Sequence, residues 1–155
     1  MAYTCEIRNI PSRPAITIRT RTPLKNLKQV LDNSFQAIID YMDEIGEKPA
    51  GPPFVIYYNM DMDDLDIEIG FPAAKKLSGI GYVAASETPH GKFLTTMYSG
   101  PYSGIESAYT ALTEWGTDNK LEMTGVAVES YIDDPKIIPE QELHTQVMFA
   151  LKKET

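Results

Sequence analysis

Apolar and polar residues alternate along two early segments of the chain and then change to a helical spacing. Residues 3–10 and 15–22 alternate loosely, and each segment stops at a proline, which predicts two β-strands. From Leu24 to Gly46 apolar residues recur at helical intervals, which predicts a long amphipathic helix. Strands are predicted again at 54–59 and 65–71, on either side of an acidic turn. The order in the first half is therefore strand, strand, helix, strand, strand.

The same order of elements returns in the second half. A helix carries the apolar residues from Ile105 to Trp115, and strands are predicted at 80–86, 92–98, 125–132 and 143–151. Residues 51–57 align with 125–131 at a constant offset of 74 (125 minus 51, 131 minus 57), and their hydrophobic positions agree. We therefore predict one α+β domain over residues 1–155, built from two tandem pseudo-symmetric halves at about 1–74 and 79–153.

Each half is expected to form a small antiparallel sheet with its helix on one face, and the two helix-free faces are expected to meet in a central groove. Side chains alternate between the two sides of a strand, so Glu129 and Tyr131 share one side of the strand at 125–132. Val55 and Tyr57 are their counterparts in the first half. We place these four residues on the groove side, together with three residues of the outer strands, Glu68, Gln146 and Met148.

Glu129 is the leading candidate for a functional residue, because a charge inside a strand is costly unless it has a partner or a task. A partly desolvated carboxyl group has a raised pKa, which suits a counter-ion for a lipophilic cation or a general base near neutral pH. The sequence does not separate these two roles, and the plain alternative is a glutamate whose head reaches solvent or a lysine. Tyr109 and Trp115 lie on the apolar stripe of the second helix, as core residues or as aromatic walls.

Charge and cysteine content narrow the range of partners. The 14 basic and 22 acidic residues give a net charge of −8, which argues against direct binding to nucleic acid or to an anionic membrane surface. The single cysteine, Cys5, forms no internal disulfide, and the first residues lack the pattern of a signal peptide, so we expect a cytoplasmic protein. His90 and His144 have no set of cysteine partners with which to bind a metal, and the oxygen-rich segment 59–64 lacks the glycine of a calcium loop. Neither a metal nor a cofactor is expected.

Three groups of residues together resemble the GyrI-like small-molecule-binding family, which also provides the effector-binding domain of multidrug-sensing transcription activators. They are the run 51–58, the Gly-Pro-Tyr at 100–102 ahead of the helical segment 108–115, and the run 129–135 followed by Leu-His-Thr at 143–145. The resemblance covers nearly the whole chain. It implies two tandem halves with a ligand between them, held against aromatic walls with a buried glutamate as counter-charge.

Glu129 and Tyr131 stand where the resemblance implies this glutamate and a neighbouring aromatic residue. The chain departs from the family pattern at two positions. Gln146 stands where some drug-sensing members carry another acid, and Tyr98 stands where many relatives have histidine. Tyr98 is thus a further candidate for the ligand site, and Gln146 in place of an acid predicts a weaker preference for cations.

Three functions follow from this resemblance. The expected function is that of a stand-alone protein that binds a hydrophobic, aromatic or cationic small molecule against Glu129. An alternative is a hydrolase in which Glu129 activates water, since some stand-alone members resemble hydrolases that open cyclopropane rings. A second alternative is an interaction module that inhibits an enzyme such as gyrase, which requires a protein partner.

Overall fold

The computed structural model describes residues 3–153. These residues form eight strands and two α-helices, joined by turns and short 3₁₀ segments. In chain order the main elements are β1 (Glu6–Ile10), β2 (Pro14–Thr22), α1 (Leu27–Glu44), β3 (Phe54–Tyr57), β4 (Leu65–Pro72), β5 (Ala84–Glu87), β6 (Gly91–Ser99), α2 (Glu106–Asp118), β7 (Met123–Tyr131) and β8 (His144–Leu151).

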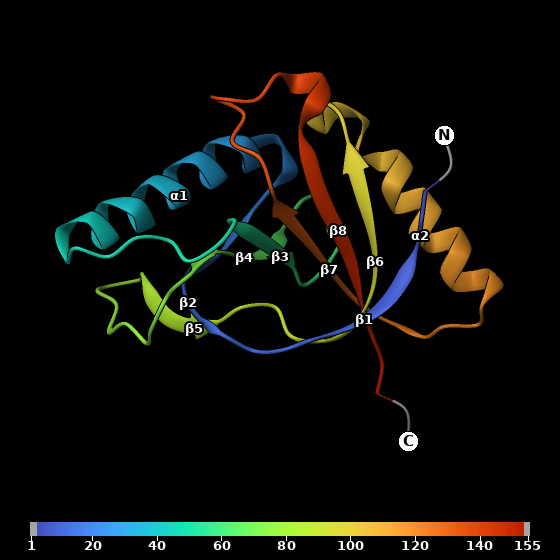
Figure 1. Ribbon diagram of the computed structural model, residues 1–155, viewed down its shortest axis with the longest axis horizontal. Helices are drawn as coiled ribbons and strands as arrows, with labels where there is room; N and C mark the ends of the chain where they lie inside the picture. The colour runs from blue at the N-terminus through green and yellow to red at the C-terminus, as the bar shows by residue number, and fades with distance from the viewer. Residues whose placement is uncertain (1–2, 154–155) are drawn as a thin grey trace.

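All eight strands join one antiparallel sheet in the order β1-β6-β8-β7-β3-β4-β2-β5 (Figure 1). The pairing of β3 with β7 joins the strands of the two predicted halves directly. The first strand of each predicted half lies at the far edge of the sheet, because β1 pairs with β6 and β5 pairs with β2. The fold is therefore α+β as predicted, with one continuous sheet in place of two sheets set side by side.

Both helices cover the same face of the sheet. α1 packs on β2 and β4, and α2 packs on β6 and β8. The cluster of buried residues on the central strands, which includes Val55 and Ile67, is packed against Phe35 of α1 and Tyr109 of α2. Figure 1 shows the two helices on opposite sides of the view with the central strands between them. The face above β3 and β7 is thus flanked by one helix on each side.

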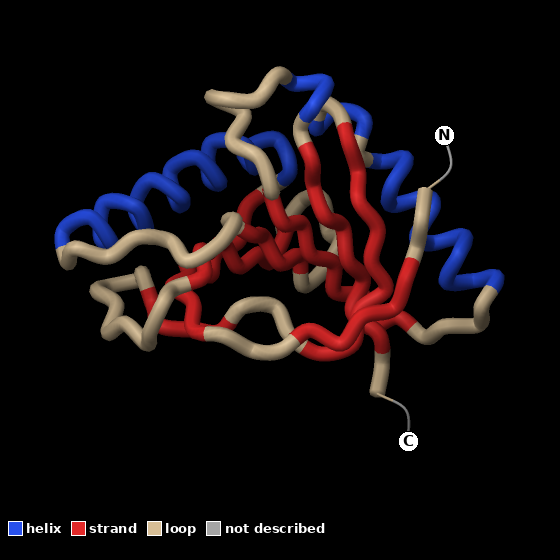
Figure 2. Tube along the Cα trace, in the orientation of Figure 1, coloured by secondary structure: helices blue, strands red, loops and turns tan. Residues whose placement is uncertain are grey.

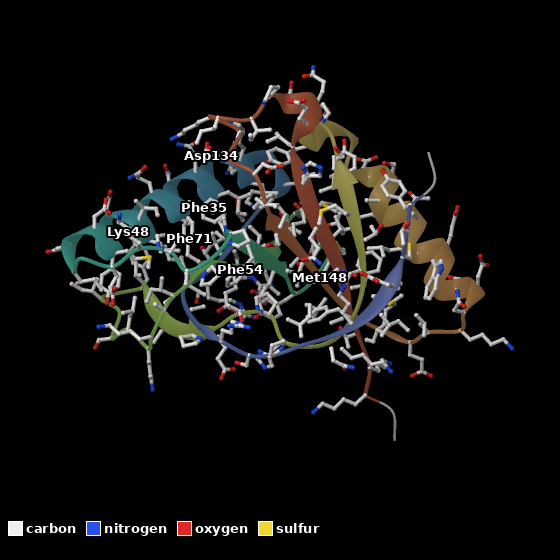
Figure 3. The ribbon with its side chains drawn as sticks, viewed as in Figure 1. Phe35, Lys48, Phe54, Phe71, Asp134 and Met148 are labelled. Atoms are coloured by element: carbon white, nitrogen blue, oxygen red, sulfur yellow. The ribbon has the colours of Figure 1, made fainter. Side chains whose placement is uncertain are left out.

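The opposite face has its own apolar cluster, which neither α1 nor α2 covers. Phe54 and Met148, both labelled in Figure 3, belong to this cluster. It also contains Ala15 of β2 and Phe93 of β6, although four strands lie between β2 and β6 in the sheet order. A flat sheet would hold these two strands far apart, since neighbouring strands are spaced by about 4.8 Å. The sheet is curled around this cluster, as the trace in Figure 2 shows.

The predicted elements agree with the observed ones except near their ends, and β5 differs most. The pattern predicts a strand at 80–86, whereas β5 begins at Ala84. Gly79 and Gly81 both have positive φ, 75° and 59°, and Ile80 and Val83 form an isolated bridge across the turn between them. A side chain at Gly79 would collide with the carbonyl oxygen of Val83. Residues 79–83 therefore form a tight turn that only glycine at position 79 allows.

Candidate functional site

Glu129 lies in the middle of the face that the helices cover. β7 pairs with β3 and β8 in a register that sets Glu129 directly opposite Val55 and Val147. Directly opposite residues of antiparallel strands point to the same face, and Tyr109 of α2 contacts the Glu129 carboxylate from that side. Glu129 therefore projects between α1 and α2 and has apolar neighbours on both adjoining strands.

The prediction that the site residues of the sheet share one helix-free face is wrong. Four of the predicted site residues, Glu129, Tyr131, Val55 and Tyr57, lie on the face that α1 and α2 cover. Three others, Glu68, Gln146 and Met148, lie on the opposite face, where Glu68 pairs with Ile56 and Met148 pairs with Val128. The alternation in β7 defines two sides, but both are partly apolar, so the sequence alone does not show which side the helices cover.

Two tyrosine hydroxyls donate hydrogen bonds to the Glu129 carboxylate. Tyr109 Oη lies 2.5 Å from Oε2, and Tyr131 Oη lies 2.8 Å from Oε1. Burial raises the pKa of Glu129 above its ordinary value, and the two hydrogen bonds lower it by less. Burial and the nearby Glu129 charge raise the pKa of both tyrosines, so each remains a neutral donor. Among the described residues, the Glu129 carboxylate thus accepts side-chain hydrogen bonds only from neutral hydroxyl groups.

Aromatic rings surround this carboxylate from both helices and from the sheet. The Phe35 ring lies 5.5 Å from that of Phe71 and 6.4 Å from that of Tyr131, centroid to centroid, both edge to face. Tyr102 stands edge to face with Tyr131 at 5.6 Å, and Tyr109 and Phe149 are also 5.6 Å apart. Phe35, Phe71, Tyr102 and Phe149 were not among the predicted site residues. The internal alignment contained a signal for one of them, because Phe35 matches Tyr109 at the offset of 74 (109 minus 35).

The segment between β7 and β8 forms an acidic rim beside these rings. Tyr102 is 38% exposed, and burial, followed by the charges of Asp133, Glu129 and Asp134, raises its pKa. Asp133 also accepts a hydrogen bond from the backbone N–H of His144, and its Oδ2 lies 2.7 Å from His144 Nδ1. In Figure 3 the labelled Asp134 lies on this segment, at the top of the view. The rim gives a negative potential to the accessible side of the aromatic cluster.

Two other predicted site residues, Tyr98 of β6 and Trp115 of α2, belong to the apolar cluster between α2 and the sheet. Tyr98 is buried and donates a 2.5 Å hydrogen bond to the Pro101 carbonyl oxygen, while Trp115 packs at the edge of the same apolar cluster. Gly104 packs against the Tyr98 hydroxyl, where a larger residue would collide with it. These contacts give both side chains a packing role in the support of α2 and of the segment that precedes it.

Glu68, on the opposite face, is a buried carboxylate and is only 9% exposed, whereas Glu129 is half-buried. It accepts hydrogen bonds from the hydroxyls of Thr17 at 2.8 Å, Ser86 at 2.9 Å and Tyr58 at 2.5 Å. The Arg19 guanidinium stacks on the Tyr58 ring, 3.8 Å from its centroid. Glu68 is thus well satisfied within the protein, and it lies away from the aromatic rings around Glu129.

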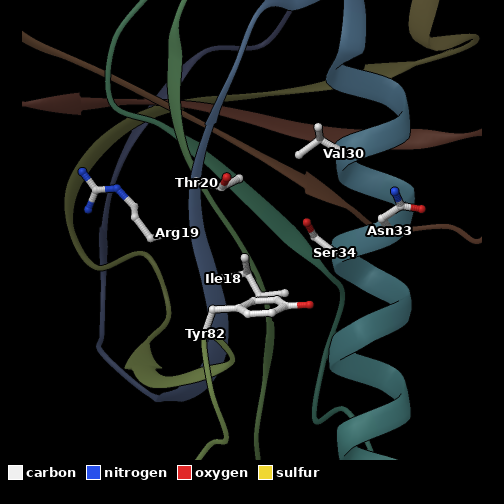
Figure 4. Close-up of a pocket in the computed structure, with 7 residues that line it drawn as sticks. All are labelled: Ile18, Arg19, Thr20, Val30, Asn33, Ser34 and Tyr82. Atoms are coloured by element: carbon white, nitrogen blue, oxygen red, sulfur yellow. The ribbon is translucent and has the colours of Figure 1, made fainter.

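A shallow pocket of about 270 Å³ lies between α1 and β2 (Figure 4). Its lining consists of residues from these two elements and one exposed ring from the turn before β5: Ile18, Arg19, Thr20, Val30, Asn33, Ser34 and Tyr82. No carboxylate lines it, and Arg19 already forms a two-point ion pair with Asp66. Its chemistry differs from that of the Glu129 site.

Residues 3–153 contain neither a cluster of metal-binding side chains nor a membrane-spanning helix. Within this range no group of three or more His, Cys, Asp and Glu side chains is placed to hold a metal ion. None of the helices in the same range has the length and apolar character that crossing a bilayer requires.

The comparison that decides the family is with sequence models of protein domains. The model described as the GyrI-like small molecule binding domain matches residues 3–152. The chain belongs to this GyrI-like family. A search of curated protein sequences found no significant match.

Solved structures of low sequence identity share the GyrI-like fold. The C-terminal domain of EcmrR superposes with a TM-score of 0.85 at 21% identity, over 99% of this chain and 100% of that domain. In a complex of EcmrR with DNA the TM-score is 0.83, and this chain spans only 58% of the EcmrR chain. A hydrolase from Listeria innocua also matches, with a TM-score of 0.68 at 13% identity over 96% of this chain and 91% of that one. SAV2435 bound to tetraphenylphosphonium matches with a TM-score of 0.65 at 9% identity over 98% of this chain and 94% of that one.

Proposed function

We propose that this GyrI-like domain binds a hydrophobic, aromatic small molecule between α1 and α2, with a preference for cations and with Glu129 as the counter-charge. The observation that carries this proposal is the pairing of Glu129 with tyrosine hydroxyls alone, inside a ring of aromatic side chains. An ionised carboxylate out of water is costly without an opposite charge. A lipophilic cation supplies that charge and satisfies the aromatic faces as well.

Entry of a ligand requires the tyrosines to give up the carboxylate. Tyr109 and Tyr131 occupy both oxygens of Glu129, and the Tyr102 ring packs against Tyr131 on the more exposed side. We infer that a ligand enters beside Tyr102 and takes the place of one tyrosine hydroxyl at Glu129. The negative rim at Asp133 and Asp134 favours the approach of a cation over that of an anion.

Two ions of nearly the same shape and opposite charge test the proposal. Tetraphenylphosphonium and tetraphenylborate are each titrated by calorimetry into the wild type, into Glu129→Gln and into the control Glu68→Gln. We expect the wild type and the control to bind the cation and to discriminate against the anion. Glu129→Gln should lose about tenfold in affinity for the cation, as removal of a close opposite charge costs on the order of 1–2 kcal/mol. Equal binding of both ions by the wild type would contradict the proposal.

A second candidate is hydrolysis of a cyclopropane-bearing electrophile, and the raised pKa of Glu129 favours it. A carboxylate with a raised pKa is a suitable general base near neutral pH. In this reaction Glu129 takes a proton from a water molecule as the water oxygen bonds to a ring carbon, the strained carbon–carbon bond breaks, and its electron pair passes into the electron-accepting group conjugated to the ring, which then takes up a proton. Chromatography of an alkylator of this class after incubation with the wild type and with Glu129→Gln tests the candidate, and unchanged substrate in both samples would eliminate it.

A further inference from the structure

One buried hydroxyl group on the same face has no hydrogen-bond partner among the described residues. Within residues 3–153, the hydroxyl oxygen of Thr145 is the buried side-chain oxygen that makes no hydrogen bond to the protein. Thr145 is 0% exposed and lies in β8. A buried hydroxyl without a partner is destabilising, since its hydrogen bonds to water are lost on folding and nothing replaces them. Valine has nearly the same shape and would avoid this penalty.

The sheet register places Thr145 beside the Glu129 site. Thr145 lies directly opposite Tyr131 of β7 on one side and Tyr98 of β6 on the other. Glu129 lies opposite Val147, two residues further along β8, so Thr145 and Glu129 are diagonal neighbours on the same face. Diagonal neighbours of this kind are about 7–8 Å apart, with their Cβ atoms somewhat closer, which is about the length of an aromatic ring with its substituents.

Both tyrosines next to Thr145 use their hydroxyls elsewhere. Tyr98 donates to the Pro101 carbonyl oxygen, and Tyr131 donates to Glu129. A ligand that displaces the Tyr131 hydroxyl from Glu129 also moves the ring that stands beside Thr145. The movement that exposes the carboxylate therefore changes the surroundings of the unpaired hydroxyl.

We propose that Thr145 is a second polar anchor of the site and that its ligands are lipophilic cations with a hydroxyl or carbonyl oxygen about one aromatic ring away from the charge. This inference rests on the proposed function, because it assigns the cationic group to Glu129. The Thr145 hydroxyl can donate to a carbonyl oxygen or accept from a hydroxyl group. The unpaired hydroxyl then lowers the stability of the ligand-free protein and contributes to recognition of the ligand.

Two matched probes test this inference. Tetraphenylphosphonium has no hydrogen-bonding group, and (4-hydroxyphenyl)triphenylphosphonium adds one hydroxyl at the far end of a ring. We expect the wild type to bind the hydroxylated probe about 3- to 10-fold more tightly, the effect of one additional hydrogen bond. In Thr145→Val this ratio should fall to about 1, and in Thr145→Ser, which keeps a hydroxyl, it should persist.

Thr95→Val is a matched control, because Thr95 is a buried threonine of β6 whose hydroxyl donates to the Glu6 carbonyl oxygen at 3.3 Å. It should lower the melting temperature and leave the ratio of the two affinities as in the wild type. Thr145→Val should raise the melting temperature of the ligand-free protein by about 2–4 °C, because it removes an unpaired buried hydroxyl. A variant that merely loosens the fold would lower it.

The outcomes separate this inference from the proposed function. If both probes bind the wild type and Thr145→Val retains the preference for the hydroxylated one, the role of Thr145 is overturned and that of Glu129 stands. If the wild type shows no preference between the probes, the role of Thr145 is again overturned. If neither probe binds the wild type, the proposed function fails and the inference fails with it.

Discussion

Replacing Glu129 with glutamine should make the ligand-free protein more stable, and this gain should increase with pH. Burial raises the pKa of Glu129 above its ordinary value of 4.5 by more than the two tyrosine hydrogen bonds lower it. Between the ordinary and the raised pKa, the folded protein holds a proton that the unfolded chain has released. The stability contributed by this group is therefore fully present below pH 4.5 and is lost as the pH rises through the folded-state pKa.

The size of the gain depends on two opposing effects. Each unit by which folding raises the pKa of a carboxyl group lowers the stability at high pH by about 1.4 kcal/mol. The rise in pKa is the net of burial and of the hydrogen bonds from Tyr109 and Tyr131, which are worth about 1.5–3 kcal/mol to a charged group and about 1 kcal/mol to a neutral one. Glutamine is neutral at every pH and removes this net loss, so we expect a gain on the order of 1 kcal/mol near pH 8 and little difference below pH 4.5.

Urea denaturation of the wild type and Glu129→Gln, repeated at pH values from about 4 to about 8, measures this difference. Both proteins share every other titrating group, so their difference isolates residue 129. A wild type that became more stable than the variant as the pH rose would contradict this prediction. That result would mean that the tyrosine hydrogen bonds outweigh burial and that the pKa of Glu129 is lowered.

Three further predictions concern the surroundings of Glu129 and the opposite face. Tyr109→Phe removes a hydrogen bond to the charged carboxylate and should therefore raise the pKa of Glu129 further. In a fluorescence titration, the pH midpoint of tetraphenylphosphonium binding should then move upward, and a downward move would contradict this role of Tyr109. Glu68→Gln should lower stability by about 1–3 kcal/mol in urea denaturation, because it disturbs a carboxylate that accepts three hydrogen bonds from hydroxyl groups. An unchanged stability would show that those hydrogen bonds are dispensable. Gly70→Ala would bring the new Cβ to 2.6 Å from Thr17 Cγ2 and 2.9 Å from the Ile16 carbonyl oxygen. It should lower the free energy of unfolding by about 1–3 kcal/mol in the same assay, and an unchanged stability would show that β2 can shift away.

Local pattern was sufficient to predict the elements and their order. Alternation, proline stops and the helical spacing from Leu24 onward depend on neighbours in sequence, and most of the predicted segments overlap the observed ones closely. Glu129 could also be selected from the sequence, because a lone carboxylate in an apolar strand is conspicuous whatever lies around it. The GyrI-like resemblance drawn from the same residues agrees with the family match over residues 3–152.

The pairing between distant segments was decided by the tertiary structure. Nothing in the sequence of β1 or β5 indicates that each pairs with a strand of the other half, because the ladder uses backbone groups that every residue carries. The face of β7 that the helices cover depends in the same way on packing across the whole sheet. Since both sides of that strand are partly apolar, only the assembled fold sets Glu129 between α1 and α2 and leaves Glu68 on the other side.

The partners of each side chain follow from that choice of face. Tyr109 could be read from sequence as a core residue of a helix, and only the approach of α2 to β7 brings its hydroxyl to the carboxylate. The sequence likewise does not predict the unpaired Thr145 hydroxyl, because threonine is an ordinary strand residue. The sequence by itself therefore determined the elements and the charged residue, and the tertiary structure determined which hydroxyls, rings and buried groups surround that residue.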